Sequence, residues 1–220
     1  MVIAHPSATV IPLREVGDGY EILLIHRNPK LSFHGGAWAF PGGRIDPDDY
    51  VSNDDVIEAA RRAAVRESRE EAGIHVPSED MVLISQWTTP ESQPKRFKTW
   101  FFIAQIPDQN VLVDGGETLD YRWMSPTRAL NAQRTGEIVL MPPTFVSITR
   151  LSHHSTIDAV LSNMVANPLE EFLPRIRIVE GGFLSLYNSD AAYEGGALDQ
   201  PGRRHRLWAL ESGWKYEHTD

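Results

Sequence analysis

The chain has 220 residues, of which 41% are hydrophobic and 23% charged, a length and composition that allow a globular protein with a sizeable core. The formal net charge of −9 argues against non-specific nucleic-acid binding, and no apolar run approaches the roughly 20 residues that a membrane span requires. The absence of cysteine excludes disulfides, thiolate nucleophiles and cysteine zinc sites. The N-terminus lacks the layout of a secretory signal, which fits a cytoplasmic enzyme.

Apolar runs in the first half of the chain predict a series of β-strands. Residues 8–13 predict an opening strand, placed at a sheet edge because of Pro12. After a turn at 17–19, the continuous apolar run at 20–27 predicts a buried strand that forms a hairpin with the first. Later apolar runs predict further strands at 81–88, 97–106 and 119–124.

Helical signals alternate with these strands. A long helix is expected from Asn53 or Asp54, either of which is a good N-cap, to Ala72, just before Gly73. Shorter helices are expected at 125–135, from Pro142, and at 155–164. The last part of the chain has short strand-like runs at 175–179, 183–186, 205–210 and 214–216. Strands with interspersed helices predict an α/β fold in which a mixed sheet lies between helices.

The last turns of the long helix carry an acidic stripe. Glu67, Glu70 and Glu71 have the i, i+3, i+4 spacing that places them on one face, where they continue the small apolar stripe of Ala60 and Ala64. Carboxylates on a face turned to the protein body repel one another unless a cation compensates them. Oxygen ligands suit a hard divalent ion such as Mg²⁺ or Mn²⁺. Taken alone, the same pattern is also that of a charged, exposed helix end.

The surroundings of the stripe favour the metal site. Phe40-Pro41-Gly42-Gly43 precedes the helix, Arg66-Glu67-x-x-Glu70-Glu71-x-Gly73-Ile74 ends it, and Glu58 lies eight residues before Arg66. This pattern closely resembles the signature of the Nudix hydrolases. It departs from that signature in two ways: fourteen residues rather than five separate Gly43 from Glu58, and Ser68 stands where an apolar residue is usual. The extra residues fall in the polar segment 46–55, which is expected to be a surface loop.

The resemblance implies a Nudix α/β/α sandwich, with a catalytic core over residues 1–135 and a C-terminal extension, 136–220, packed on that core. It also implies a site in which Mg²⁺ or Mn²⁺ activates water against a diphosphate. By match to the motif, Glu67, Glu70, Glu71 and the Gly42 carbonyl would bind the metal, and Glu67 is also a candidate general base. Arg66 and Glu58 would hold these glutamates in position.

Other charged residues are candidates for completing the site. Glu117 and Asp120 could supply a further carboxylate, or could belong to a solvated turn. Two basic clusters could bind substrate phosphates, one containing Lys95 and Arg96 and the other Arg204 in the tail. Basic runs of this kind also occur as solvated strand edges that prevent aggregation.

The segments 33–46 and 87–102, with the longer loop before the helix, resemble the Nudix group that contains the coenzyme A diphosphatases. That resemblance implies cleavage of coenzyme A or acyl-coenzyme A into adenosine 3′,5′-bisphosphate and (acyl-)phosphopantetheine. Hydrolysis of ADP-ribose or of a dinucleotide, and ligand sensing without catalysis, stay open as alternatives. The expected partner is a small nucleotide derivative, with no nucleic acid and no membrane. A cytoplasmic location is expected, and the oligomeric state is left open, a homodimer included.

Overall fold

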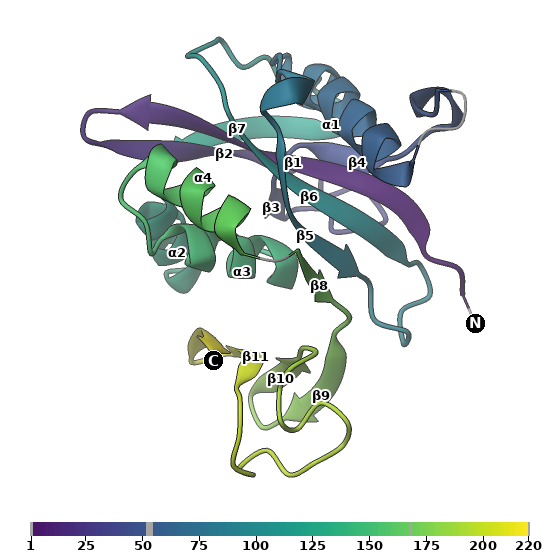
Figure 1. Ribbon diagram of the computed structural model, residues 1–220, viewed down its shortest axis with the longest axis vertical. Coiled ribbons are helices and arrows are strands. Elements are labelled where there is room, and N and C mark those ends of the chain that lie inside the picture. The colour runs from purple at the N-terminus through teal and green to yellow at the C-terminus, as the bar shows by residue number, and fades with distance from the viewer. Residues whose placement is uncertain (1, 52–54, 168, 220) are drawn as a thin grey trace.

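The larger of two sheets is mixed and contains eight strands of the described chain (Figure 1). The computed structural model describes residues 2–51, 55–167 and 169–219. The strands of this sheet are β1 (His5–Val16), β2 (Gly19–Arg27), β3 (Trp38–Ala39), β4 (Gly42–Arg44), β5 (Val82–Thr88), β6 (Phe97–Gln105), β7 (Thr118–Met124) and β8 (Glu170–Phe172). Their order is β3-β2-β1-β6-β5-β8, with β4 paired to β1 and β7 to β2. β1 is parallel to β6 and β5 to β8, while the other pairs are antiparallel.

Helices cover both faces of this sheet, so the α/β/α sandwich expected from the sequence is confirmed (Figure 1). On one face lies α1 (Val56–Ala72), whose buried alanines pack in one cluster with Val10 and Leu23 of the sheet. Small side chains let the helix approach the sheet closely, which brings its acidic end near the strands. The other face carries α2 (Pro126–Arg134), α3 (Pro142–Leu151) and α4 (Ile157–Ala166), which pack in a second cluster with residues such as Leu24 and Phe101.

The expectation that the first strand is an edge strand is wrong, because β1 lies at the centre of the sheet. Its partner β6 runs along residues 5–13 on one side. On the other side, β4 pairs with Ser7–Thr9 and β2 with Leu13–Val16. Pro12 falls in the gap between these two partners, where no ladder needs its missing N–H. A central strand can therefore contain this proline.

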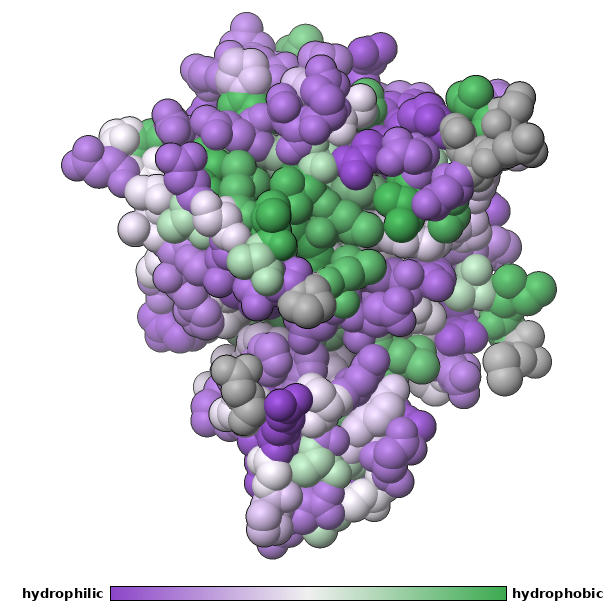
Figure 2. All heavy atoms as spheres, in the orientation of Figure 1, coloured by the Kyte–Doolittle hydropathy of each residue, from purple (hydrophilic) through white to green (hydrophobic). Residues whose placement is uncertain are grey.

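A second, four-stranded antiparallel sheet follows β8, in the order β12-β11-β10-β9. It consists of β9 (Arg175–Val179), β10 (Gly182–Leu186), β11 (His205–Leu210) and β12 (Gly213–His218). Figure 1 shows it beyond the α2–α4 layer, at the opposite end of the molecule from α1. Its separate core cluster is small, with Leu184, Leu186 and Ala192 as the buried members. In the space-filling view of Figure 2, apolar side chains gather over the larger unit, while the smaller sheet is mostly polar.

The predicted elements agree well with those observed, apart from their ends. The N-cap of α1 is Asp55, whose side chain accepts a hydrogen bond from the Ile57 N–H; the expected caps Asn53 and Asp54 lie outside the described residues. The division of the chain into a core, 1–135, and an extension, 136–220, stays a prediction. Within the extension, α3 and α4 pack in the core cluster of the larger sheet and β8 pairs with a strand of that sheet. None of the described helices combines the length and apolar character that a membrane span requires.

Candidate active site

The acidic end of α1 lies directly against the glycine-rich strand β4. The Gly42 N–H donates a hydrogen bond of 2.9 Å to Glu71 Oε2. A β-carbon added at Gly43 would lie 2.2 Å from Glu67 Oε1, closer than any real contact. One at Gly42 would lie 2.4 Å from the Ala8 carbonyl oxygen of β1. Both glycines are therefore required by close approach, and they place the two carboxylates beside the backbone of β4.

The negative charges of the Glu67 and Glu71 carboxylates are buried and only partly compensated by neighbouring cations. Glu71 is only 4% exposed, and burial raises the pKa of its carboxyl to about 8, against the opposing Gly42 N–H and Arg27. Arg27 Nη1 lies 3.6 Å from Glu71 Oε1. Burial also raises the pKa of Glu67, opposed by Arg66, and the negative charge of Glu117 raises the pKa of both carboxyls. Glu117 thus belongs to the acidic group, while Asp120 accepts a hydrogen bond from the adjacent Tyr121 N–H.

Arg66 connects the acidic helix to the segment that precedes it. Its guanidinium donates to Glu67 Oε1 at 2.8 Å and to Glu70 Oε2 at 3.0 Å. It also donates to Asp49 Oδ2 at 2.9 Å and to the Arg44 carbonyl at 2.9 Å. The hydrogen bond that Arg66 donates to Asp49 is the largest of the contacts that raise the pKa of Arg66, so the arginine stays charged. One side chain thereby fixes two of the three glutamates.

The expectation that Glu58, together with Arg66, holds the glutamates of the site in position is not supported by the contacts of Glu58. Glu58 lies two helical turns before Arg66, its side chain is 53% exposed, and its ion pair is with Arg61 at 3.4 Å. Asp49 holds Arg66 instead, and it is buried in the short 3₁₀ turn η1 (Pro47–Asp49). The extra residues of this chain consequently follow Asp49, and segment 46–55 is only partly a surface loop.

Of the three candidates in the two expected basic clusters, Arg96 and Arg204 are bound to backbone carbonyls, and Lys95 alone is left exposed. Arg96 is buried and donates to the Thr89 carbonyl at 3.1 Å and the Val2 carbonyl at 2.8 Å, so its guanidinium holds backbone rather than a substrate. Arg204 lies just before β11 in the smaller sheet, far from α1 in Figure 1, and donates to the Gly202 and Gln200 carbonyls. Lys95 is exposed, and its ammonium lies over the rings of Phe33 and Phe97.

A hard divalent cation fits the acidic group by its chemistry. The group offers carboxylate oxygens only. Burial raises the pKa of two of these carboxyls, Glu67 and Glu71, and a bound cation would stabilise their ionised forms. Glu67, Glu70 and Glu71 are the residues that would hold it, with Glu117 beside them. The Gly42 carbonyl stays a predicted ligand, since the contact of Gly42 with Glu71 is made by its N–H.

Sequence reasoning missed two residues of the site. Asp49 could have been found, because five residues separate Gly43 from Asp49, which is the family spacing between the glycine and its first acidic residue. The contact of Arg27 with Glu71 could not be predicted from the sequence. Arg27 is the last residue of β2, and only the tertiary fold brings it close to Glu71.

This α/β/α fold, with carboxylates on a helix packed against a glycine strand, defines a class of metal-assisted hydrolase domains. The chain belongs to the Nudix family of hydrolases: the NUDIX domain matches residues 4–141. The fold is similar to that of a solved NUDIX hydrolase from Alicyclobacillus acidocaldarius, with a TM-score of 0.64 and 22% identity, over 76% of this chain and 100% of that one.

Curated relatives include diphosphatases with different named substrates. The chain is 29% identical over 117 residues to the acyl-coenzyme A diphosphatase NUDT19 of Xenopus laevis, and 30% identical over 115 residues to that of Homo sapiens. Each match covers 50% of this chain and 31% of the relative, so the chain spans about a third of their length. It is 32% identical over 122 residues to a putative 8-oxo-dGTP diphosphatase of Bacillus subtilis, over 56% of this chain and 67% of the relative.

Proposed function

We propose that this chain is a divalent-metal-dependent diphosphatase that cleaves coenzyme A or acyl-coenzyme A within the diphosphate. The products would be adenosine 3′,5′-bisphosphate and phosphopantetheine or its acyl derivative. The observation that carries the proposal is the carboxylate group at the end of α1, packed on Gly42 and Gly43 and joined by Arg66 to Asp49. The two acyl-coenzyme A diphosphatases among the relatives support this choice of substrate.

Each residue of the site has a distinct part in this proposal. A bound Mg²⁺ or Mn²⁺ would neutralise phosphate oxygens and lower the pKa of water. Glu67, Glu70 and Glu71 would hold the metal, and Glu67 is also the candidate that accepts the proton from water. Arg66 orients Glu67 and Glu70 by hydrogen bonds, and Asp49 fixes the other side of the Arg66 guanidinium.

A cationic and aromatic surface next to β4 supports binding of an adenine nucleotide. We call it the Arg44–Lys95 surface. Arg44, the last residue of β4, lies 3.4 Å from the His5 ring, whose centroid is 6.2 Å from that of Phe97. Lys95 lies 5.4 Å from the Phe97 ring centroid and 5.7 Å from that of Phe33. Exposed cations beside aromatic rings suit a phosphate next to a base, and this surface replaces Arg96 and Arg204 in the proposal.

Two other functions remain as alternatives within the family. The Bacillus subtilis relative favours a nucleoside triphosphate with a damaged base, and the acidic site alone would serve ADP-ribose or a dinucleotide equally well. A sensor domain would bind such ligands without cleaving them. The intact set of glutamates and their contacts with β4 favours catalysis over sensing. Cytoplasmic location and oligomeric state stay predictions.

A substrate panel with product masses tests the proposal. Coenzyme A, its 3′-dephospho form, an acyl-coenzyme A, ADP-ribose and 8-oxo-dGTP would each be incubated with Mg²⁺ or Mn²⁺, and with excess chelator. We expect coenzyme A compounds to be cut fastest, chelator to abolish turnover, and added metal to restore it. Glu67→Gln should lose orders of magnitude in rate while staying folded. Faster turnover of ADP-ribose or 8-oxo-dGTP would contradict the assignment of coenzyme A as the substrate. Full activity in excess chelator would contradict the metal dependence.

A further inference from the structure

A second group of metal-ligating side chains lies where the two sheets meet. His205 begins β11 and His218 ends β12, and the two residues face each other in the strand pairing. Their rings stack with centroids 4.4 Å apart. Glu170, from β8 of the larger sheet, places Oε1 3.3 Å from His205 Nε2 and 3.9 Å from His218 Nε2. Within residues 2–51, 55–167 and 169–219, these are the only three His, Asp or Glu residues whose ligand atoms all lie within 4.8 Å of one another.

The contacts around His205 leave one of its nitrogens unsatisfied. Its Nδ1 lies 3.1 Å from Ser189 Oγ, whereas Nε2 is buried, faces Glu170 and has no hydrogen-bond partner. When Nδ1 donates to Ser189, the Nε2 lone pair points at a carboxylate oxygen. A cation between the two atoms removes that repulsion.

We propose that Glu170, His205 and His218 form a structural metal site, for Zn²⁺, that links β8 to the smaller sheet. Zinc binds histidine nitrogens and carboxylate oxygens at roughly 2.0–2.2 Å, which puts neighbouring tetrahedral ligands about 3.3 Å apart. The two distances from Glu170 Oε1 to the histidine nitrogens, 3.3 and 3.9 Å, are close to this value, and all three ligand atoms lie within 4.8 Å of one another. Two imidazoles with one carboxylate suit zinc, whereas the glutamates of α1 suit magnesium.

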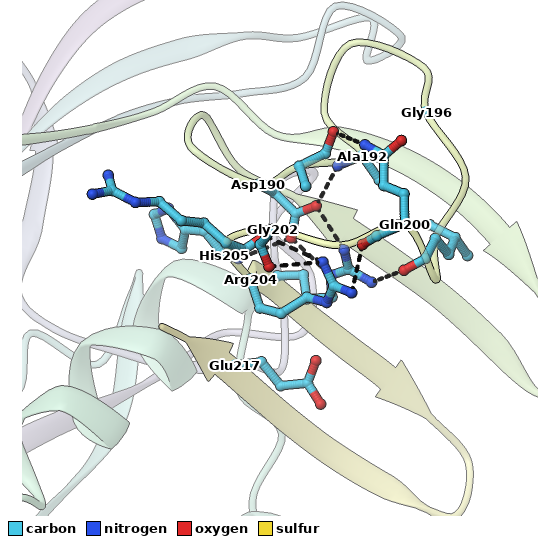
Figure 3. A network of polar contacts seen from close by, with 12 residues as sticks. Asp190, Ala192, Gly196, Gln200, Gly202, Arg204, His205 and Glu217 are labelled. Atoms are coloured by element: carbon cyan, nitrogen blue, oxygen red, sulfur yellow. Dashed lines mark hydrogen bonds and ion pairs between the residues drawn. The ribbon is translucent and has the colours of Figure 1, made fainter. Parts of the chain in front are cut away.

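The surroundings hold the three ligands in place. Arg150 binds Glu170 Oε2 at 2.9 Å, which leaves Oε1 directed at the histidines. The backbone N–H of His205 donates a hydrogen bond of 2.8 Å to Asp190 Oδ2, and Asp190 is fixed in turn by a two-point ion pair with the buried Arg206 (Figure 3). The Asp190 contact fixes the backbone at His205, and the contact of Ser189 Oγ with His205 Nδ1 orients the ring, as a second contact commonly does for histidine ligands of metals.

The ring of Tyr216 lies beside both histidines, and its hydroxyl lacks a partner. The Tyr216 hydroxyl is buried and has no hydrogen-bond partner, and the charge of Glu170 adds to the burial that raises its pKa. The Tyr216 ring lies 5.8 Å from the His205 ring and 6.0 Å from the His218 ring, between centroids. A water on the ion would give this hydroxyl a partner.

The smaller sheet packs partly on the main core cluster, through Leu207, Trp214 and Tyr216, and has only a small cluster of its own. Its separate cluster has three buried members, and the chain has no cysteine for a disulfide. Units with small cores commonly depend on a metal or a disulfide. A metal joining β8, β11 and β12 fixes the start of β11 and the end of β12 to a strand of the larger sheet.

Zinc binding to the full chain tests this site without reference to catalysis. Protein stripped by chelator is titrated with zinc chloride against a chromophoric zinc indicator, in millimolar Mg²⁺ to occupy the glutamates of α1. We expect one Zn²⁺ per chain and a rise of several degrees in the midpoint of thermal unfolding. His218→Ala, whose side chain is 40% exposed, should weaken zinc binding by at least about tenfold.

Matched controls keep the outcome decisive. His153→Ala, at an exposed position, should bind zinc like the unaltered chain. Glu170→Gln provides a second ligand variant, and Co²⁺ provides a visible absorption band that reports tetrahedral histidine ligation and should vanish in His218→Ala. Circular dichroism verifies that each variant is folded. Equal zinc affinity and equal Co²⁺ spectra in the unaltered chain and His218→Ala, or no zinc bound at one equivalent, would overturn the proposal.

Discussion

Arg66 Nη2 lies 2.9 Å from Asp49 Oδ2, and this ion pair joins the acidic helix to the 3₁₀ turn after the glycine strand. The same guanidinium binds Glu67 and Glu70, so Asp49 sets the position of two candidate metal ligands without touching either. The carboxyl of Asp49 is buried, and its loss would leave part of a charged guanidinium unpaired.

Asp49→Asn should therefore reduce both activity and stability. We expect a rate loss of about 10- to 100-fold, because a residue that orients ligands has been altered, and a stability loss of about 3 kcal/mol. Rates with Mg²⁺ and urea unfolding curves measure the two effects. Glu58→Gln is the matched control, since Glu58 is exposed and pairs with Arg61. If Glu58→Gln lost more activity than Asp49→Asn, the sequence-based role of Glu58 would be restored.

A second prediction concerns the contact between Gly43 and Glu67. In Gly43→Ala the new β-carbon would lie 2.2 Å from Glu67 Oε1, so the carboxylate must move. Because the displaced atoms are the end of a flexible side chain, we expect a stability loss of about 1 kcal/mol or less but an activity loss of about 100-fold. Gly19→Ala is the control, with its nearest atom at 3.8 Å. Unaltered turnover by Gly43→Ala would show that Glu67 need not occupy this position.

The sequence predicted the sheet and helices because their apolar patterns are local. The acidic stripe, the glycine pair and Arg66 were also found, since the family signature fixes their spacing. Contacts between distant segments were not predictable. Arg27 reaches Glu71 from another strand, and Arg96 donates a hydrogen bond to the carbonyl of Val2 near the N-terminus; neither contact is indicated by the local sequence. Pro12 misled because proline avoids central strands in general, yet here it falls in a gap between two partners.

Glu71 predicts a pH dependence of stability in the metal-free protein. Its pKa of about 8 in the fold exceeds the ordinary glutamate value of 4.5, so between these pH values the folded state keeps a proton that the unfolded state has lost. This group therefore lowers the free energy of unfolding by about 1.4 kcal/mol per pH unit as pH rises through that window. Glu71→Gln keeps the shape without the charge, so its stability relative to the unaltered chain should increase from pH 5 to pH 8.

Urea unfolding in chelator at several pH values measures this difference. Glu91→Gln, at an exposed turn, provides the control variant. A pH-independent difference between Glu71→Gln and the unaltered chain would mean that Glu71 is not the titrating group. Added Mg²⁺ should remove most of the advantage of Glu71→Gln above pH 7, because the cation favours the ionised carboxylate.

The last prediction separates the neighbours Lys95 and Arg96, which the sequence placed in one cluster. Lys95 is exposed on the Arg44–Lys95 surface, whereas Arg96 is 6% exposed and holds the Thr89 and Val2 carbonyls. Lys95→Ala should leave the free energy of unfolding within about 0.5 kcal/mol and raise KM for coenzyme A more than for its 3′-dephospho form. Arg96→Ala should instead destabilise the fold by about 2 kcal/mol or more, with no selective effect on the 3′-phosphate.

Arg204→Ala should leave KM unaltered for both substrates, because its contacts are with the smaller sheet. Kinetics with both substrates, together with urea unfolding, measure these differences. A selective KM effect in Arg204→Ala and none in Lys95→Ala would place the 3′-phosphate on the smaller sheet and refute the Arg44–Lys95 surface.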